Sequence, residues 1–472
     1  MFKKYNEMKK TTILFTVALV LVALTYPHKE QKQKNILFIS IDDLRPELGC
    51  YGQTQIISPN IDSIASKAVV FKNAVCNVPV CGASRASLMT GLRPNKSRFL
   101  NFKSRADEDV DLIPTLGEWF IKNGYYTISN GKIFHKLNDS PESWTEKAWR
   151  PKKDFRDYLN KENIEIAQKN KGHGPAFEVG INSTEKYIDT QVLEKSIQDL
   201  NKLKQIDKPF FLAVGLSKPH LPFNAPKKYW DLYDSTDIQL ADNRYAPKNA
   251  PKESLHQYNE LRKYYQIPSQ KFTTIPDSTQ RKLIHGYYAC VSYVDALVGQ
   301  LLDHLKKINL NDNTIVVLWG DHGWQLGEHD LWAKHSNYQT SLKVPLIIYS
   351  NEIDKGIINQ QAELVDLYPT LCEMVNIEQP DHLQGTSLLP IMKNLESKTE
   401  SFSRFHNAVS ITTEKYSYTE WRAKKTDSVY AKMLYDLEVD PNENTNISGN
   451  EKLLDIQIEL SKKIDSLVLI NN

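Results

Sequence analysis

The sequence predicts an α/β fold with a large, mostly parallel central sheet flanked by helices, followed by a smaller C-terminal α+β domain with an antiparallel sheet. Several apolar runs do not alternate with polar residues, which is typical of strands buried on both faces of a parallel sheet. Segments with helical spacing of apolar residues lie between these runs. After about residue 355 the pattern becomes alternating, which favours a second, antiparallel sheet.

Four apolar runs each end in charged or imidazole side chains, and we interpret each run as a strand with the residues that follow it. They span residues 34–45, 123–135, 208–223 and 313–323. The spacing of apolar residues predicts helices over 111–123 and 283–308. The segment 224–280 is rich in Pro, Lys, Asn and Tyr and has weak periodicity. We expect it to be a long surface excursion that could wall a substrate cleft.

The C-terminal part has its own pattern. Residues 365–377 predict one more helix, whereas 408–422 and 432–446 predict antiparallel strands with turns. We therefore divide the chain into a signal peptide and linker, a main domain and a smaller C-terminal domain, at residues 1–33, 34–355 and 356–472.

The first residues have the layout of a secretory signal. Residues 1–10 are basic, and 11–24 form an uninterrupted, mostly apolar run before a polar segment. Because this run is short for a transmembrane helix, we expect a secreted or periplasmic protein without stable membrane insertion. An uncleaved anchor or a misplaced start is the alternative.

Composition sets further limits. The 472 residues are enough for two domains, or for one large domain with an appendage. The 59 basic and 57 acidic residues give a net charge of +2, which gives no reason to expect a nucleic-acid partner. Five cysteines are an odd number, so at least one thiol stays unpaired within the chain, and their spacing matches no zinc motif.

Polar residues at the ends of the apolar runs indicate where a ligand binds. In open α/β sheets, ligands bind outside the carboxyl ends of the strands. If the four runs are parallel neighbours, one edge of the sheet gathers Asp42, Asp43, Lys132, His135, His220, Asp321 and His322.

Cys81 lies at the start of a predicted helix and close to an arginine. A helix N-terminus and nearby positive charge both favour the thiolate, so the residue is a candidate reagent. The alternatives are a packed structural thiol and a disulfide with Cys76.

Two stretches carry a resemblance to a known family. CGASRASLMTG (81–91) resembles the first sulfatase signature, and GYYTISNGKIFH (124–135) resembles the second. The closing LYDLEVDPNENTN resembles the usual C-terminal strand of that family. Within the family, DDLRPELGCYG, GKIFH, KPHLPF and DHGWQLGEHDLWAK are most similar to the iduronate-2-sulfatase group.

The resemblance implies an enzyme with an alkaline-phosphatase-like sandwich fold, in which residues 34–355 form the catalytic sulfatase domain. It implies that a formylglycine-generating maturase converts Cys81 to formylglycine, whose hydrated gem-diol is the nucleophile and forms a covalent sulfo-enzyme. Position 83 is Ala where many relatives have Pro, which leaves open which maturase accepts the site.

A divalent cation is also implied, calcium by resemblance. Asp42, Asp43 and Asp321 supply oxygen ligands of the type that hard cations prefer, and the oxygen at position 81 completes the shell. His322 is an unusual ligand for such an ion, although the iduronate-2-sulfatase group resembles this chain in having Asp-His here.

The remaining roles are carried over from the family. Arg85 lies about one helical turn after Cys81 and would fix the hydroxyl of the nucleophile. Lys132 and Lys334 would contact sulfate oxygens. His220, alone or with Lys334, would protonate the departing sugar oxygen, and His135 would take a proton from the second hydroxyl. Trp324 either shapes the sugar pocket or packs.

The sequence thus favours a sulfatase that acts on a sulfated oligosaccharide. An exo-acting enzyme on uronate-containing fragments of glycosaminoglycan or algal polysaccharide is the expectation, although no motif identifies the sugar. The alternatives are a phosphatase or phosphodiesterase of the same superfamily and a sulfated-glycan-binding protein with an inactive site.

Overall fold

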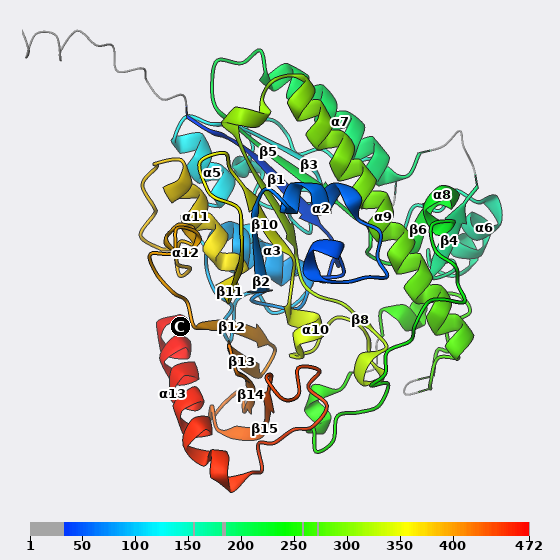
Figure 1. Cartoon of the computed structure of the whole chain (residues 1–472), viewed down its shortest axis with the longest axis vertical. Coiled ribbons are helices and arrows are strands. Elements are labelled where there is room, and N and C mark those ends of the chain that lie inside the picture. Colours follow the sequence, from blue (N-terminus) through cyan, green and yellow to red (C-terminus); the bar gives the residue numbers. More distant parts are fainter. Residues whose placement is uncertain (1–32, 154–155, 182–185, 257–258, 271–272, 472) are drawn as a thin grey trace, which may run out of the picture. The chain divides into compact units, whose positions relative to one another are not determined.

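A seven-stranded β-sheet lies at the centre of the protein in the computed structural model (Figure 1). Its strands are β1 (Asn35–Ile41), β2 (Val69–Val75), β3 (Tyr126–Gly131), β5 (Phe210–Leu216), β7 (Thr314–Gly320), β10 (Leu346–Tyr349) and β11 (Gly356–Glu363). Their order is β11-β2-β10-β7-β1-β5-β3, and β10 alone runs antiparallel to its neighbours within this sheet. The predicted α/β class with a mostly parallel sheet is confirmed.

The structure describes residues 33–153, 156–181, 186–256, 259–270 and 273–471. The predicted signal peptide, apart from the end of its linker, lies outside these residues. Among the described residues, no helix has both the length and the apolar character that crossing a membrane requires.

Both faces of the sheet are buried. Along β1, Leu37 and Ile39 enter one core, whereas Ile36 and Phe38 enter the other. Successive side chains of a strand point to opposite faces, so a strand covered on both sides needs apolar residues without alternation. Helices α2 (Pro59–Ala65), α7 (Ile188–Leu203) and α9 (Asp277–Lys307) contribute to the first core, and α3 (Cys81–Thr90), α5 (Leu116–Lys122) and α11 (Leu367–Met374) contribute to the second.

Two helices differ from their predicted limits. The helix predicted over 111–123 is α5, which begins only at Leu116. Thr115 accepts a hydrogen bond from the Glu118 N–H, and the Glu118 side chain accepts one from the Thr115 N–H, so a capping box fixes this start. The helix predicted over 283–308 is α9, which begins earlier, at Asp277. The prediction placed the start too late because the first turn is polar and carries no apolar signal.

The segment 224–280 contains only short elements among its described residues, apart from the start of α9 at Asp277. It begins within β6 (Phe223–Pro226), which pairs in parallel with β4 (Phe177–Gly180). The other short elements of the main part are α4 (Ala106–Asp109), α6 (Lys161–Lys169), α8 (Lys227–Trp230), β8 (Gln325–Leu326), β9 (Trp332–Ala333), α10 (Gln339–Leu342) and α12 (Leu389–Met392).

The predicted C-terminal antiparallel sheet is also confirmed. Its strands, in order, are β12 (Glu400–Phe405), β13 (Ala408–Thr413), β14 (Tyr416–Arg422) and β15 (Val429–Asp436). Helix α13 (Leu454–Asn471) places Leu460 and Ile464 in one core with Val409 and Ile411.

The second sheet begins later than the predicted domain start at residue 356. Strand β11 begins at that residue, yet it pairs with β2 in the main sheet. Because β11 is an edge strand, its first half is exposed and does not form a continuous apolar run. The apolar pattern of the main sheet therefore seemed to end before this residue.

Candidate active site

The carboxyl ends of four parallel strands bring the predicted polar residues to one edge of the main sheet. Strand β1 is followed by Asp42 and Asp43, β7 by Asp321 and His322, β3 by Lys132 and His135, and β5 by His220. Because β1 lies between β7 and β5, its two aspartates are central, and the Asp43 N–H donates to Asp321 Oδ1 at 2.9 Å.

Cys81 is the first residue of α3 and is 2% exposed. Its Sγ lies 3.1 Å from His322 Nε2 and 3.8 Å from Asp43 Oδ1. Burial alone would raise the pKa of this thiol, but Lys132, Lys334 and His322 together hold it well below its usual range. The site therefore stabilises negative charge at the position of the Cys81 side-chain terminus.

All five cysteines lie among the described residues, and all are free thiols. No disulfide joins Cys76 and Cys81. The pKa of the Cys76 thiol lies well above its ordinary value, chiefly because of burial. The two cysteines thus differ in chemistry, and Cys81 has the environment of a reactive group.

Arg85 is fully buried one turn along α3 and organises the aspartates. Its Nε donates to Asp321 Oδ2 at 2.9 Å, and its Nη2 donates to Asp42 Oδ1 at 3.1 Å. Its Nη1 donates to Ser40 Oγ and to the Ile133 carbonyl, each at 2.9 Å. One guanidinium thus links three strand ends and fixes two carboxylates near Cys81.

The donor set at the strand ends fits a hard divalent cation. Two overlapping groups have ligand atoms within 4.8 Å of one another: Asp42, Asp43, Cys81 and His220, and Asp43, Cys81, Asp321 and His322. Burial raises the pKa of Asp321 to about 7, although Arg85 and His322 oppose this. Crowded, desolvated carboxylates of this kind are stabilised by a cation, and oxygen ligands are those that Ca²⁺ prefers.

His322 fits the cation less simply. Its Nδ1 contacts the Gly323 carbonyl at 2.9 Å, which leaves Nε2 facing Cys81 and Asp43. Burial lowers its pKa, but Asp321, Cys81 and Asp43 raise it to about 9. To act as a ligand, this imidazole would have to lose a proton on metal binding.

Two lysines contact the same carboxylates. Lys132 forms an ion pair with Asp42, and Lys334 Nζ lies 3.0 Å from both Asp43 oxygens. Burial would lower the pKa of Lys334, yet Asp43, Cys81 and Glu260 hold it well above its usual value. Both lysines are therefore charged and available to an anion placed near Cys81.

His220 is held in one orientation. Its Nδ1 contacts the Leu221 carbonyl at 2.7 Å, and its Nε2 lies 3.2 Å from Glu260 Oε1 and 3.9 Å from Asp43 Oδ2. Burial lowers its pKa, but the pull of Asp43 raises it to about 10. A protonated imidazole of this kind can donate a proton.

His135 has the opposite protonation state. Burial is the largest cause that lowers its pKa below the ordinary histidine value, with Lys132 adding to this and Cys81 opposing it. Its side chain hydrogen-bonds with that of Cys81, and its Nδ1 is buried without a hydrogen-bond partner among the described residues. A neutral imidazole beside Cys81 can accept a proton.

Trp324 is packed. Its side chain is 1% exposed, it stacks edge-on with Phe223 at 6.2 Å between ring centroids, and Lys334 Nζ lies 5.0 Å from its ring. It does not line the pocket that contains Cys81, His135 and His220. Trp324 thus packs beneath Lys334, and its contact with the sugar stays a prediction.

Glu260 belongs to the site, although no motif or strand end in the sequence marks it. Its carboxylate contacts both His220 and Lys334, with Oε2 3.1 Å from Lys334 Nζ. It lies in the segment 224–280, where weak periodicity gave no strand end or helix to place it. The expectation that segment 224–280 walls a cleft was the only indication that a residue of this segment could reach the site.

Five of these side chains line one cavity of about 650 Å³: Cys81, His135, His220, Glu260 and Lys334. The cations Lys136, Arg156 and Lys263 also line it, together with aromatic residues. A pocket of this size, lined by charged and aromatic side chains, suits a polar ligand of one or two rings.

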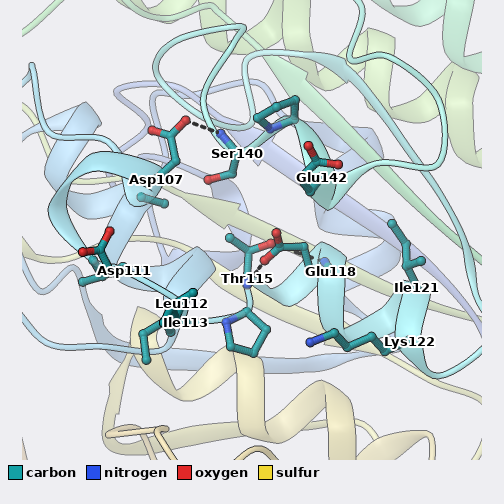
Figure 2. A pocket seen from close by; sticks show the side chains of 14 residues that line it. Asp107, Asp111, Leu112, Ile113, Thr115, Glu118, Ile121, Lys122, Ser140 and Glu142 are labelled. Carbon is teal, nitrogen blue, oxygen red and sulfur yellow. Dashed lines mark hydrogen bonds between the residues drawn. The ribbon is translucent and has the colours of Figure 1, made fainter.

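A second pocket, of about 550 Å³, lies between α4 and α5 (Figure 2). Asp107, Asp111, Glu118 and Glu142 line it, with Lys122 near its rim. Glu118 is used in the capping box of α5, and Asp107 accepts from the Ser140 N–H at 3.1 Å. None of the predicted site residues lines this pocket.

The fold and the site define an α/β protein with an anion-binding, metal-competent centre at the carboxyl edge of its sheet. A family model described as Sulfatase matches residues 34–377, and one described as N-sulphoglucosamine sulphohydrolase, C-terminal, matches residues 327–469. The chain belongs to the sulfatase family, and it is accordingly an enzyme that hydrolyses sulfuric esters.

Individual relatives agree with this assignment. Iduronate 2-sulfatase of Homo sapiens is 34% identical, over 78% of this chain and 74% of its own length. An ulvan-active sulfatase of Formosa agariphila is 28% identical, over 98% of this chain and 88% of its own length. The solved structure of BT4656 in complex with its substrate D-glucosamine-2-N,6-O-disulfate has a TM-score of 0.74 at 22% identity, and covers 93% of this chain and 98% of that chain.

Proposed function

We propose that this sulfatase removes sulfate from carbohydrates, acting at chain ends of uronate-containing fragments of glycosaminoglycan or algal polysaccharide. The names of its relatives support the carbohydrate: one is an iduronate 2-sulfatase, one is ulvan-active, and one was solved with a sulfated glucosamine. A cavity of about 650 Å³ has a size that suits a terminal sugar.

One observation carries the proposal. The side chain of Cys81 stands at the N-terminus of α3, 3.1 Å from His322, with Lys132 and Lys334 lowering its pKa and a neutral His135 beside it. A nucleophile at this place faces the groups that an anionic ester requires.

Two groups that the family uses fit this site. Asp42, Asp43 and Asp321 would hold the calcium ion, with His322 next to it, and position 81 would carry formylglycine. When bound, the ion supplies positive charge that favours ionisation of a neighbouring hydroxyl, and formylglycine supplies that hydroxyl as a hydrated aldehyde.

The side chains of the chain itself perform the remaining tasks. Lys132 and Lys334 bind sulfate oxygens and offset the charge that develops as the S–O bond breaks. His220, protonated and fixed through Nδ1, donates a proton to the departing sugar oxygen. His135, neutral, accepts a proton at position 81, and Arg85 keeps Asp42 and Asp321 in place.

We also propose that the chain is exported and that a maturase modifies Cys81 before the enzyme acts. The basic start and the apolar run over residues 11–24 support export. Edman sequencing of protein recovered outside the cytoplasm would locate the cleavage site, and an uncleaved N-terminus in the exported protein would contradict a signal peptide.

The deciding experiment combines mass analysis with a substrate screen. We expect the tryptic peptide that contains position 81 to show the mass of formylglycine, and the protein to hydrolyse an aryl sulfate faster than the matching aryl phosphate. A panel of defined sulfated oligosaccharides, with uronate or hexosamine at the sulfated end, then identifies the sugar. A fully active protein with an unmodified thiol would overturn the proposed chemistry.

A further inference from the structure

A carboxylate that the proposed chemistry does not use lies among its cations. Glu260 precedes the short 3-10 turn Leu261–Lys263, and its side chain is 22% exposed and lines the cavity. Its Oε1 is 3.2 Å from His220 Nε2, and its Oε2 is 3.1 Å from Lys334 Nζ. It therefore touches both groups that face the scissile bond in the proposed function.

Glu260 is ionised in this position. Burial alone would raise its pKa, but Lys334 and His220 hold it well below the usual range. The same two cations also face Asp43, at 3.0 Å from Lys334 Nζ and at 3.9 Å from His220 Nε2. The carboxylates of Asp43 and Glu260 therefore already partly neutralise the two cations that an incoming ester would contact.

Net charge is the main difference between a sulfate monoester and a phosphate monoester. Both are tetrahedral and of similar size, so the shape of a pocket separates them poorly. The sulfate ester carries one negative charge, whereas the phosphate ester carries close to two at pH 7 because its second pKa is about 6. A second charge beside a fixed carboxylate is repelled, and the repulsion is strong in a partly desolvated site.

We propose that Glu260 is a specificity-determining residue that disfavours dianionic phosphate monoesters relative to monoanionic sulfate esters. The inference rests on the proposed function. Lys136, Arg156 and Lys263 line the same cavity and attract dianions more strongly than monoanions. A carboxylate at the point where the ester binds counteracts that preference.

The test compares two substrates with one leaving group, 4-nitrophenyl sulfate and 4-nitrophenyl phosphate. In matured, calcium-loaded full-length enzyme, we expect Glu260→Gln to raise the phosphate-to-sulfate ratio of kcat/KM by about tenfold or more. Glu253→Gln removes the same charge from the same segment without touching the cavity, and it should leave the ratio unchanged.

The proposal is overturned if the ratio in Glu260→Gln stays at the wild-type value. Equal losses of activity on both esters would have this result, because a residue that only positions its neighbours affects both substrates alike. Glu260→Ala removes the charge in a second way, should the amide impair folding. Calorimetric binding of the two esters to Cys81→Ala protein, with and without Glu260→Gln, measures the same ratio without turnover. A wild-type enzyme that cleaves neither ester contradicts the proposed function instead.

Discussion

Single residues at this site are defined by the charges around them more than by their own type. Two histidines illustrate this. His220 faces Asp43 and Glu260 and has its pKa raised to about 10, whereas burial beside Lys132 lowers the pKa of His135. Because the two pKa values are pushed apart, one imidazole is suited to be an acid and the other a base.

The first prediction concerns the nucleophile. Cys81→Ala should reduce turnover by at least about 10⁴-fold, because the replacement leaves no atom to attack the ester. The fold should survive, since Ala is the smaller residue at a helix N-terminus. Circular dichroism and thermal melting would check the fold, and activity at the wild-type rate would refute the assignment of Cys81.

The second prediction concerns the acid. His220→Ala should cost about 10² to 10⁴ in kcat for an alkyl or sugar sulfate, because a poor leaving group needs a proton. An activated aryl sulfate with a good leaving group should lose much less. Rates for a series of aryl sulfates with different leaving-group pKa values would show this as a steeper dependence; equal losses across the series would count against an acid role.

The third prediction concerns pH. His135 must be neutral to accept a proton, and its pKa is lowered, so kcat/KM should fall only below the ordinary histidine pKa as the solution is acidified. In His135→Asn the residual activity should lack this acidic limb. His406→Gln, a change in the same cavity lining, should retain it. An acidic limb at or above the ordinary value would contradict the role given to His135.

At the scale of secondary structure, the strand ends were predictable and several other elements were not. Apolar runs such as residues 313–323 mark buried strands, and the residues after them mark the site. Three strands of the main sheet were not foreseen: β2, which carries polar residues in its middle, the short β10, and the half-exposed β11.

Glu260 shows a further limit of prediction from sequence. Its partners His220 and Lys334 lie in recognisable motifs, but Glu260 lies in a segment without periodicity, and its position depends on tertiary packing of that segment against the sheet edge. The contacts of Arg85 with the carbonyls of residues 132 and 133 were likewise not readable from spacing along one helix.

The fourth prediction tests one element. Thr115→Ala removes the side-chain acceptor of the α5 capping box and should lower the free energy of unfolding by about 1 kcal/mol. Ser278→Ala replaces an exposed helical residue of α9 and should change it by less than about 0.5 kcal/mol. Chemical denaturation of both variants would measure the difference, and equal values would argue against a stabilising cap.

At the scale of the whole molecule, the site draws on segments that are far apart in the chain. Asp42 follows β1, Asp321 follows β7, and Lys334 lies beyond β9, yet all three meet at one sheet edge. The carboxylates are in place only when the parallel strands are paired in the observed register. Binding at this edge is therefore coupled to the stability of the entire sheet.

The fifth prediction follows from that coupling. Because the unfolded chain lacks the assembled carboxylates, calcium should raise the melting temperature, and at 100 times its Kd should stabilise the fold by about 2.7 kcal/mol. Asp321→Asn should weaken this dependence, and NaCl of equal ionic strength should not reproduce it. Scanning calorimetry across calcium concentrations would check this; the same shift in Asp321→Asn would place the ion elsewhere.

The depth at which Cys81 lies has a consequence for biosynthesis. Only small molecules can reach a side chain that is 2% exposed and lies at the start of a helix beside the ends of four strands. Another protein that alters this atom must meet the nascent polypeptide before residues 314–320 have joined their neighbours. The order of events during synthesis and transport would then decide what fraction of the finished molecules is active.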